Sequence, residues 1–506
     1  MSVEPKTQEY FSSRWGLLLA TLGMAVGTGN IWRFPRIAAQ NGGGSFLIAW
    51  LIFLFLWSIP LLLVEFAMGK ATRRGTVGAF ARLLGGRYAW MGAFVGFVTM
   101  AIMFYYSVVA GWCLRYLAGA VTGQLSSLDN LEASTAFWER FTAGHSLLMS
   151  PITFHLVAML VGALVVYRGV ARGIERANKF LIPALFAILV IGAVRALTLS
   201  GPGLEGSPMA GLAYLFTPDW ERLLDYRVWL EALSQSAWST GAGWGLILTY
   251  GVYMRQKEDV VLNTFIAALG NNSASLLAAL IIFPTVFAVL PAAEATQILQ
   301  ESGPASTGLT FVWIPQLFLR VPGGSIFLIL FFLGLFFAAL SSLLSMIEMV
   351  ARNFMDAGMP RHKAIAWVGA GGFLLGLPSA YWLGFLGNQD WVWGLGLMVS
   401  GLFFAFAAIR YGPERFRSRY INTEGNDLTL GRWWDVLIRW VVPLEFVALM
   451  IWWSYKAIFQ FDREGWWNPL HPYSLATCLV QWGLALGFFL LIRKQLARWA
   501  DPESSS

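Results

Sequence analysis

Apolar stretches recur along the whole chain, and short segments that hold most of the charged residues separate them. The hydrocarbon core of a bilayer is about 30 Å thick, so a helix of about 20 apolar residues can cross it. The pattern predicts an all-α integral membrane protein with two short tails, 1–13 and 498–506. The twelve predicted transmembrane helices are 14–38, 43–69, 87–122, 152–169, 176–199, 226–254, 258–290, 324–356, 362–384, 389–411, 432–460 and 471–497.

The composition supports a membrane location. Of the 506 residues, 57% are hydrophobic and 12% are charged, whereas ordinary soluble domains carry about 25% charged residues. A soluble chain with so few charges could not cover its surface with polar groups, so lipid must solvate much of it. We therefore expect the lipid bilayer to be a partner of this chain.

The net charge of +7 comes from basic clusters that alternate with balanced or acidic segments. Basic clusters lie at 70–87, 168–179 and 410–419, whereas the segment 123–150 is mainly acidic. Loops rich in Lys and Arg remain in the cytoplasm, and an even number of spans returns the chain to its starting side. Both termini are therefore predicted to be cytoplasmic, and the basic surplus sets topology rather than binding nucleic acid.

The two cysteines indicate the compartment only weakly. Cys113 and Cys478 both fall inside predicted spans, so no disulfide framework is implied. The short tails and the absence of glycosylated loops favour a multi-pass protein of a prokaryotic inner membrane, which is the cell membrane. The sequence leaves the oligomeric state open between a monomer and a homodimer.

Two predicted spans are interrupted by glycine. The clusters are Gly23, Gly27 and Gly29 in the first span, and Gly241, Gly243 and Gly245 in the sixth. Each glycine costs a helix interior about 1 kcal/mol relative to alanine, so local unwinding is expected, although close helix packing is an alternative. Each interrupted span begins a block of five, 14–199 and 226–411, with 432–497 outside both. This correspondence predicts an inverted-repeat transporter with its site near the midplane.

The interrupted helices are flanked by neutral oxygen donors. A broken helix exposes amides that suit a carboxylate and carbonyls that suit a hard cation. No acidic residue lies between Trp15 and Trp50, so a sodium ion could be held there by amides, hydroxyls and carbonyls. A serine pair could instead bond to its own helix backbone. The donors are Asn30, Ser239, Asn271, Ser341 and Ser342.

Several motifs resemble those of the neurotransmitter:sodium symporter family. Residues 25–35 read Ala-Val-Gly-Thr-Gly-Asn-Ile-Trp-Arg-Phe-Pro and are followed by Asn-Gly-Gly-Gly at 41–44. Further matches lie at 65–69, 173–176 and 217–219. The resemblance covers all twelve spans and implies the LeuT fold, a 5+5 inverted repeat with helices 1 and 6 unwound. It also implies sodium symport in the prokaryotic amino-acid transporter branch, and no enzyme activity.

The resemblance implies two sodium sites. The first would use the carbonyl of Ala25, the side-chain amides of Asn30 and Asn271, Ser239, and the substrate carboxylate. The second would use the carbonyls of Gly23, Val26 and Ala338 and the hydroxyls of Ser341 and Ser342.

The resemblance also implies the substrate pocket. Gly27 stands where monoamine transporters have an aspartate, so the substrate should bring its own carboxylate. The indole of Trp244 favours a small neutral amino acid such as glycine or alanine, or N-methylated glycine, although Gly241 partly offsets its bulk. The implied pocket residues are Gly27, Thr28, Gly29, Ile102, Tyr106, Trp238, Ser239, Gly241, Trp244, Ser342 and Met346.

The sequence is also compatible with other functions. The substrate could be a larger hydrophobic amino acid, or a betaine-like methylated ammonium compound that stacks on tryptophan. The chain could also bind a substrate as a sensor without transporting it. A channel is disfavoured because the polar residues concentrate around the two interruptions. The four histidines have no metal-ligand spacing, which disfavours an enzyme.

The gate and the chloride site are the last implied features. Arg33 and Asp390 would form an outer gate with Trp238 as its lid, although Arg33 could instead snorkel to the interface. Trp50 stands where a tyrosine is expected in the chloride site, and its N–H could donate to an anion or its bulk could close the site. Chloride binding is therefore an open expectation. The matching chloride residues are Gln235, Ser239, Asn271 and Ser275.

Overall fold

The computed structural model describes residues 9–143, 149–201, 204–300 and 308–500. Every regular element in these ranges is a helix. The helices of the first half are α1 (Arg14–Ala25), α2 (Thr28–Gln40), α3 (Gly44–Phe53), α4 (Ile59–Thr72), α5 (Thr76–Leu84), α6 (Ala89–Val121), α7 (Leu131–Thr142), α8 (Pro151–Tyr167), α9 (Arg176–Leu197) and α10 (Pro208–Phe216).

The second half is helical in the same way. Its helices are α11 (Tyr226–Ser239), α12 (Leu246–Val252), α13 (Val260–Val289), α14 (Ala292–Gln300), α15 (Ile314–Leu319), α16 (Gly324–Asp356), α17 (Arg361–Tyr381), α18 (Leu383–Tyr411), α19 (Pro413–Phe416), α20 (Trp433–Val436), α21 (Val442–Lys456), α22 (Leu475–Leu491) and α23 (Arg493–Ala500). Short π-helical turns extend several of them, including η4 (Val170–Glu175), which leads directly into α9.

Eight continuous helices in the described residues are long and apolar enough to cross a membrane, and a ninth results if α22 and α23 count as one. α22 and α23 are bent by 66°, so the predicted span 471–497 is not straight. The predicted spans 14–38 and 226–254 are each divided into two helices. α8 is a shorter apolar helix of 17 residues, at the lower end of the range that can cross a bilayer.

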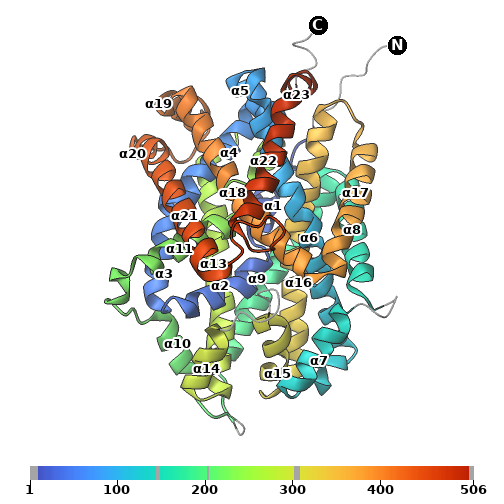
Figure 1. Ribbon diagram of the computed structural model, residues 1–506, viewed down its shortest axis with the longest axis vertical. Coiled ribbons are helices and arrows are strands. Elements are labelled where there is room, and N and C mark those ends of the chain that lie inside the picture. The colour runs from blue at the N-terminus through green and yellow to red at the C-terminus, as the bar shows by residue number, and fades with distance from the viewer. Residues whose placement is uncertain (1–8, 144–148, 202–203, 301–307, 501–506) are drawn as a thin grey trace.

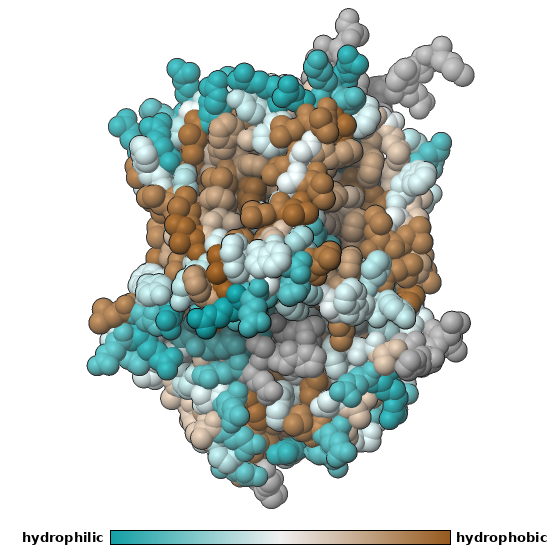
Figure 2. Space-filling view, viewed as in Figure 1, coloured by the Kyte–Doolittle hydropathy of each residue, from teal (hydrophilic) through white to brown (hydrophobic). Residues whose placement is uncertain are grey.

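The helices place loops and short helices at two opposite ends of the molecule. α5, α19 and α23 lie at one end, and α7, α10, α14 and α15 lie at the other (Figure 1). An apolar belt separates hydrophilic surfaces in Figure 2. Large apolar side chains such as Leu164, Leu444 and Leu484 are more than 60% exposed. Exposed apolar surface of this extent indicates contact with lipid.

The interrupted helices lie inside the bundle. α1 packs against α9, α13 and α16, and α2 packs against α13 and α14. α12 packs along α4, while the long helices α6 and α16 pack along each other. The two interruptions are therefore surrounded by continuous helices, which position the side chains described next.

Candidate functional site

The first interruption separates α1 from α2 at Val26 and Gly27. Val26 has φ −79° and ψ 97°, which breaks the helical hydrogen-bond pattern after Ala25. Gly27 is extended, and its N–H donates to the Asn30 side-chain oxygen at 3.0 Å. The Thr28 N–H donates to the Tyr106 hydroxyl at 3.3 Å. The break therefore ends α1 in free carbonyls and starts α2 with amides, as helix termini require.

Oxygen atoms converge beside this break. The Asn271 side-chain oxygen lies 2.9 Å from the Ala25 carbonyl oxygen and 3.0 Å from the Ser239 carbonyl oxygen. Rotating the amide would let its NH2 donate to both carbonyls, but would also set it against the NH2 of Asn30, 2.8 Å away. The Gly27 N–H fixes Asn30 in its orientation. Three acceptors thus face one another, which fits a hard cation such as sodium.

A second group of oxygens lies where α1 meets α16. The Ser342 hydroxyl oxygen is 3.3 Å from both the Gly23 and the Val26 carbonyl oxygens. The neighbouring Ser341 hydroxyl donates to the Ala338 carbonyl at 3.1 Å, which is a bond within its own helix. These carbonyls belong to the C-terminal end of α1, where the helix dipole favours a cation. Of the residues predicted for the second sodium site, Gly23, Val26 and Ser342 are therefore together, and Ala338 and Ser341 belong to the same stretch of α16 as Ser342.

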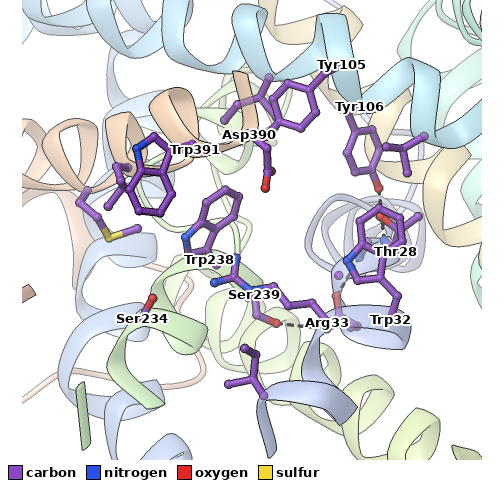
Figure 3. A pocket seen from close by; sticks show the side chains of 18 of the residues that line it. Thr28, Trp32, Arg33, Tyr105, Tyr106, Ser234, Trp238, Ser239, Asp390 and Trp391 are labelled. Atoms are coloured by element: carbon purple, nitrogen blue, oxygen red, sulfur yellow. Dashed lines mark hydrogen bonds between the residues drawn. The ribbon is translucent and has the colours of Figure 1, made fainter. Parts of the chain in front are cut away.

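One cavity of about 690 Å³ contains all the predicted substrate residues. Figure 3 shows Thr28 and Tyr106 joined across it by a hydrogen bond. A Cβ added to Gly27 would lie 3.2 Å from the Tyr106 hydroxyl and 3.3 Å from the Ser342 hydroxyl. The lining residues from the prediction are Gly27, Thr28, Gly29, Ile102, Tyr106, Trp238, Ser239, Gly241, Trp244, Ser342 and Met346.

The predicted gate residues line the same cavity but stand apart. No ion pair joins Arg33 to Asp390 in the described part of the chain; the Arg33 guanidinium lies 4.6 Å from the centre of the Trp238 ring. Asp390 lies beside Tyr105 (Figure 3). The aromatic face of Trp238 therefore stabilises the Arg33 charge. The cavity continues past these two gate residues.

The cavity has a further lining that the sequence did not predict. The Lys456 ammonium is 2.6 Å from the Glu231 carboxylate, which also accepts from the Trp452 indole at 3.2 Å. Arg36 lines the same region and is 8% exposed. Glu231 and Lys456 are far apart in sequence. The one sequence feature that could have indicated this ion pair is the presence of a charged residue inside each of two apolar spans.

The opposite end of α1 is closed. Phe11 is buried, and its N–H donates to the Tyr253 carbonyl at 3.1 Å. The buried Glu348 carboxylate pairs with Arg361 at 2.5 Å and accepts a hydrogen bond from the Tyr253 hydroxyl. The segment before α1 also bonds to Glu175, through the Ser12 N–H at 2.6 Å. These contacts tie the segment before α1 to η4 and Tyr253, and Tyr253 in turn to α16 and Arg361.

The second interruption lies between α11 and α12, at residues 240–245. Gly241, Gly243 and Gly245 all have positive φ, of 79°, 89° and 74°, a backbone region that favours glycine. The fully buried Glu65 carboxylate of α4 accepts from the Gly243 N–H at 2.5 Å and the Gly245 N–H at 2.8 Å. The carboxylate satisfies amides that the helix break leaves without a partner.

Only part of the predicted chloride set is joined by hydrogen bonds. The Asn30 NH2 donates to the Ser275 hydroxyl at 2.8 Å and to the Ser239 hydroxyl at 3.2 Å. Asn271 donates to the same Ser239 hydroxyl at 3.0 Å. Both hydroxyls accept, so their own protons are free to donate. The Trp50 indole N–H and the Gln235 side-chain oxygen have no partner among the described residues.

Comparison with known proteins agrees with this geometry. Residues 8–139 and 124–497 match the sodium:neurotransmitter symporter family. An uncharacterized sodium-dependent transporter of Methanocaldococcus jannaschii is 30% identical over 88% of this chain and 90% of its own. The sodium-dependent serotonin transporter of Drosophila melanogaster is 29% identical over 89% of this chain and 77% of its own.

A solved structure supports the same assignment. The crystal structure of MhsT in complex with L-phenylalanine has a TM-score of 0.74 and 32% identity, covering 88% of this chain and 99% of that one. MhsT has the LeuT fold, and the family consists of sodium-coupled transporters rather than enzymes. The motif at 25–35, the helix interruption beside it and the match over nearly the whole chain lead to one conclusion. The chain belongs to the sodium:neurotransmitter symporter family.

Proposed function

We propose that this chain imports a small neutral amino acid together with sodium by alternating access. One observation carries the proposal: the Asn271 side-chain oxygen faces the Ala25 and Ser239 carbonyl oxygens at 2.9 and 3.0 Å. Acceptors at this spacing repel one another unless a cation lies among them. The Ser342 hydroxyl donates to the Gly23 and Val26 carbonyls at 3.3 Å, which brings together the oxygens expected for a second site, so two sodium ions are proposed.

A substrate carboxylate would complete the first site. Gly27 leaves space between the Tyr106 hydroxyl and the Ser342 hydroxyl, within about 3.3 Å of where a side chain would begin. The hydroxyl of Tyr106 and the amides at the start of α2 suit a carboxylate. Trp244 lines the cavity and is 7% exposed, so its indole occupies volume that a large substrate side chain would need. Glycine, alanine and N-methylated glycine are the proposed substrates.

A second candidate is a larger hydrophobic amino acid. The observation that favours it is the similarity to MhsT, whose structure contains L-phenylalanine. A betaine-like compound stacking on Trp238 or Trp244, and a sensor that binds without transport, are further outcomes of the experiment below.

The proposed topology has twelve membrane crossings and cytoplasmic termini in a prokaryotic inner membrane. The blocks 14–199 and 226–411 form the two inverted repeats, and 432–497 lies outside them. The grouping of α5, α19 and α23 at one end supports this arrangement, because the basic clusters 70–87 and 410–419 belong to these elements and their neighbours. The protein would act as a monomer or a homodimer.

Chloride is proposed to bind beside the first sodium ion. The hydroxyls of Ser239 and Ser275 each accept from Asn30 and retain a proton to donate. The Asn271 NH2 lies next to them, and the Trp50 indole N–H has no other partner among the described residues. These donors suit an anion.

Alternating access would require one end of the cavity to close before the other end opens. Closing Arg33 toward Asp390, with Trp238 between, would seal the open end, and releasing Phe11 would open the other. Two sodium charges moving through 100 mV release about 4.6 kcal/mol, which supports a substrate gradient of about a thousandfold. A co-transported chloride would reduce this electrical contribution.

Uptake of radiolabelled glycine and alanine into proteoliposomes tests the proposal. Uptake should require an inward sodium gradient and should fall at least about tenfold in Ser342→Ala, because a sodium ligand is lost. Ser400→Ala is the control, since Ser400 is likewise a buried serine of a long helix, but its hydroxyl has no hydrogen-bond partner in the described chain. Replacing chloride with gluconate tests whether uptake requires chloride. Sodium-driven uptake of phenylalanine or betaine alone would favour the second candidate, and binding without uptake would indicate a sensor.

A further inference from the structure

Asn178 on α9 holds a buried polar atom that the proposed mechanism does not use. The side chain is fully buried, and its NH2 donates to the Ile174 carbonyl one turn earlier at 3.0 Å. The side-chain oxygen has no hydrogen-bond donor among the described residues. An unpaired buried oxygen of this kind costs about 1–3 kcal/mol, so its retention requires a reason.

The unpaired oxygen points at Gly23 of α1. A Cβ added to Gly23 would lie 2.2 Å from it, so only glycine lets the two helices meet here. The carbonyl oxygen of Gly23 is 3.3 Å from the Ser342 hydroxyl and belongs to the second sodium site. Asn178 is therefore the polar side chain of α9 that adjoins this site.

The direction of contact places this oxygen on a particular side of the site. In a helix each Cα–Cβ bond tilts toward the N-terminus, whereas the carbonyl points toward the C-terminus. The Asn178 oxygen occupies the Cβ side of Gly23, so it lies nearer the start of α1 than the sodium ligands do. In the proposed topology the start of α1 is the cytoplasmic end.

The segment before α1, which covers the end of the molecule opposite the gate residues, is bonded to this same end of α9. Glu175, one turn before Asn178, accepts from the Ser12 N–H at 2.6 Å and from the Ser12 hydroxyl at 2.5 Å. Lys179 pairs with the same carboxylate at 2.7 Å. Releasing the segment before α1 would expose this part of α9 first. The route from the second sodium site to the cytoplasm then runs past Asn178.

From this geometry we infer that the Asn178 side-chain oxygen is the exit ligand of the second sodium ion. The inference rests on the proposed function, which supplies the site and the orientation. An amide oxygen is a suitable ligand for a hard cation. As the ion leaves Gly23 and Ser342 inward, Asn178 replaces one of the oxygens that it loses. The unpaired oxygen gains a partner in that step, which lowers the barrier to release.

Asn263 on α13 provides a matched control. It is also fully buried, its NH2 also donates to a carbonyl one turn earlier, that of Asp259 at 2.5 Å, and its oxygen also has no partner in the described chain. It belongs to none of the sodium, substrate or gate groups described above. Replacing it with alanine therefore reproduces the loss of packing and of one hydrogen bond without touching the exit route.

The test compares Asn178→Ala, Asn178→Asp and Asn263→Ala in the full-length protein. In proteoliposomes, Asn178→Ala should slow sodium-driven uptake about tenfold relative to Asn263→Ala. The external sodium concentration that gives half-maximal uptake should change by less than about twofold, because the ligands met from outside remain. A merely structural role would lower both variants equally.

A second readout does not depend on transport. The melting temperature of the purified protein is measured against sodium chloride, with choline chloride holding ionic strength constant. Asn178→Asp places a charge beside the ion and should lower the half-saturating sodium concentration about tenfold. Asn178→Ala transporting as fast as Asn263→Ala, or Asn178→Asp leaving that concentration unchanged, would overturn the inference. Full sodium stabilisation of Ser342→Ala would instead contradict the proposed site itself.

Discussion

The two helix interruptions differ in what satisfies their backbone. Between α11 and α12 the chain leaves its helix for residues 240–245, and the Glu65 carboxylate accepts two of the exposed amides. Between α1 and α2 the helix is lost only at Val26 and Gly27, and no carboxylate reaches them among the described residues. The second interruption is thus closed by the protein's own anion, whereas the first presents its oxygens to the cavity.

This difference indicates a division of roles. A break whose amides are held by a buried carboxylate is rigid, and it can position Trp238, Ser239 and Trp244 around a ligand. A break whose carbonyls face other acceptors is complete only with a cation. The first interruption would therefore respond to sodium, and the second would hold its shape with or without it.

The largest effect is expected from removing the carboxylate. Glu65→Ala leaves the amides of Gly243 and Gly245 buried without an acceptor, at about 1–3 kcal/mol each. The melting temperature should fall strongly whether or not sodium is present, and uptake should be lost. Differential scanning fluorimetry of the purified protein in sodium and in choline measures the melting temperature.

Glu65→Gln is the matched control for this change. Glutamine keeps the shape and one acceptor oxygen, so we expect about half of the destabilisation. If Glu65→Ala instead lost only its stabilisation by sodium, the second interruption would also depend on the ion. The two breaks would then be alike.

The next effect concerns the first interruption and the space beside it. Gly27→Ala places a Cβ 3.2 Å from the Tyr106 hydroxyl and 3.3 Å from the Ser342 hydroxyl. Overpacking of this degree costs about 1–3 kcal/mol, so substrate affinity should fall about 5- to 140-fold. Scintillation proximity binding of labelled alanine measures this. A Cβ on Gly29 meets nothing within 4 Å, so Gly29→Ala should cost clearly less, and an equal loss would argue against a steric cause.

A smaller effect is expected on substrate choice. Trp244→Phe removes part of the indole from the cavity and leaves the second interruption intact. Uptake of leucine relative to alanine should rise about tenfold, the usual range for one or two methylenes in an apolar pocket. Trp57→Phe is the control, because Trp57 is a buried indole outside the cavity whose N–H is likewise unpaired in the described chain. An unchanged ratio would mean that Trp244 does not limit substrate size.

Much of this architecture was predictable because it is local in sequence. The apolar run 324–356 has the same bounds as α16, and the glycine clusters lie at the two helix breaks. The motif at 25–35 contains the cavity residues Gly27, Thr28 and Gly29, and the resemblance over the whole chain implied the others. Apolar periodicity and glycine propensity act over a few residues, so a single sequence carries them.

The remaining features depend on contacts between distant segments. Glu65 belongs to the family match at 65–69, but its partners Gly243 and Gly245 are 178 and 180 residues away. The Glu231–Lys456 pair spans 225 residues. The 66° bend between α22 and α23 also had no local signal that the hydropathy pattern could register. Packing between helices decides all three, and spacing along one chain does not encode it.

The smallest expected effect separates the two interruptions by the reason each needs glycine. Gly241 has φ 79°, so Gly241→Ala forces an L-residue into the left-handed region at about 1–2 kcal/mol. Among the described residues its Cβ would meet only the flexible end of the Met24 side chain, with the sulfur 3.1 Å away and the methyl 3.9 Å away. The melting temperature should therefore drop slightly in sodium and in choline alike, while alanine affinity changes less than in Gly27→Ala. A variant that kept its melting temperature but lost affinity would show that Gly241, like Gly27, is needed for the space in the cavity rather than for the backbone.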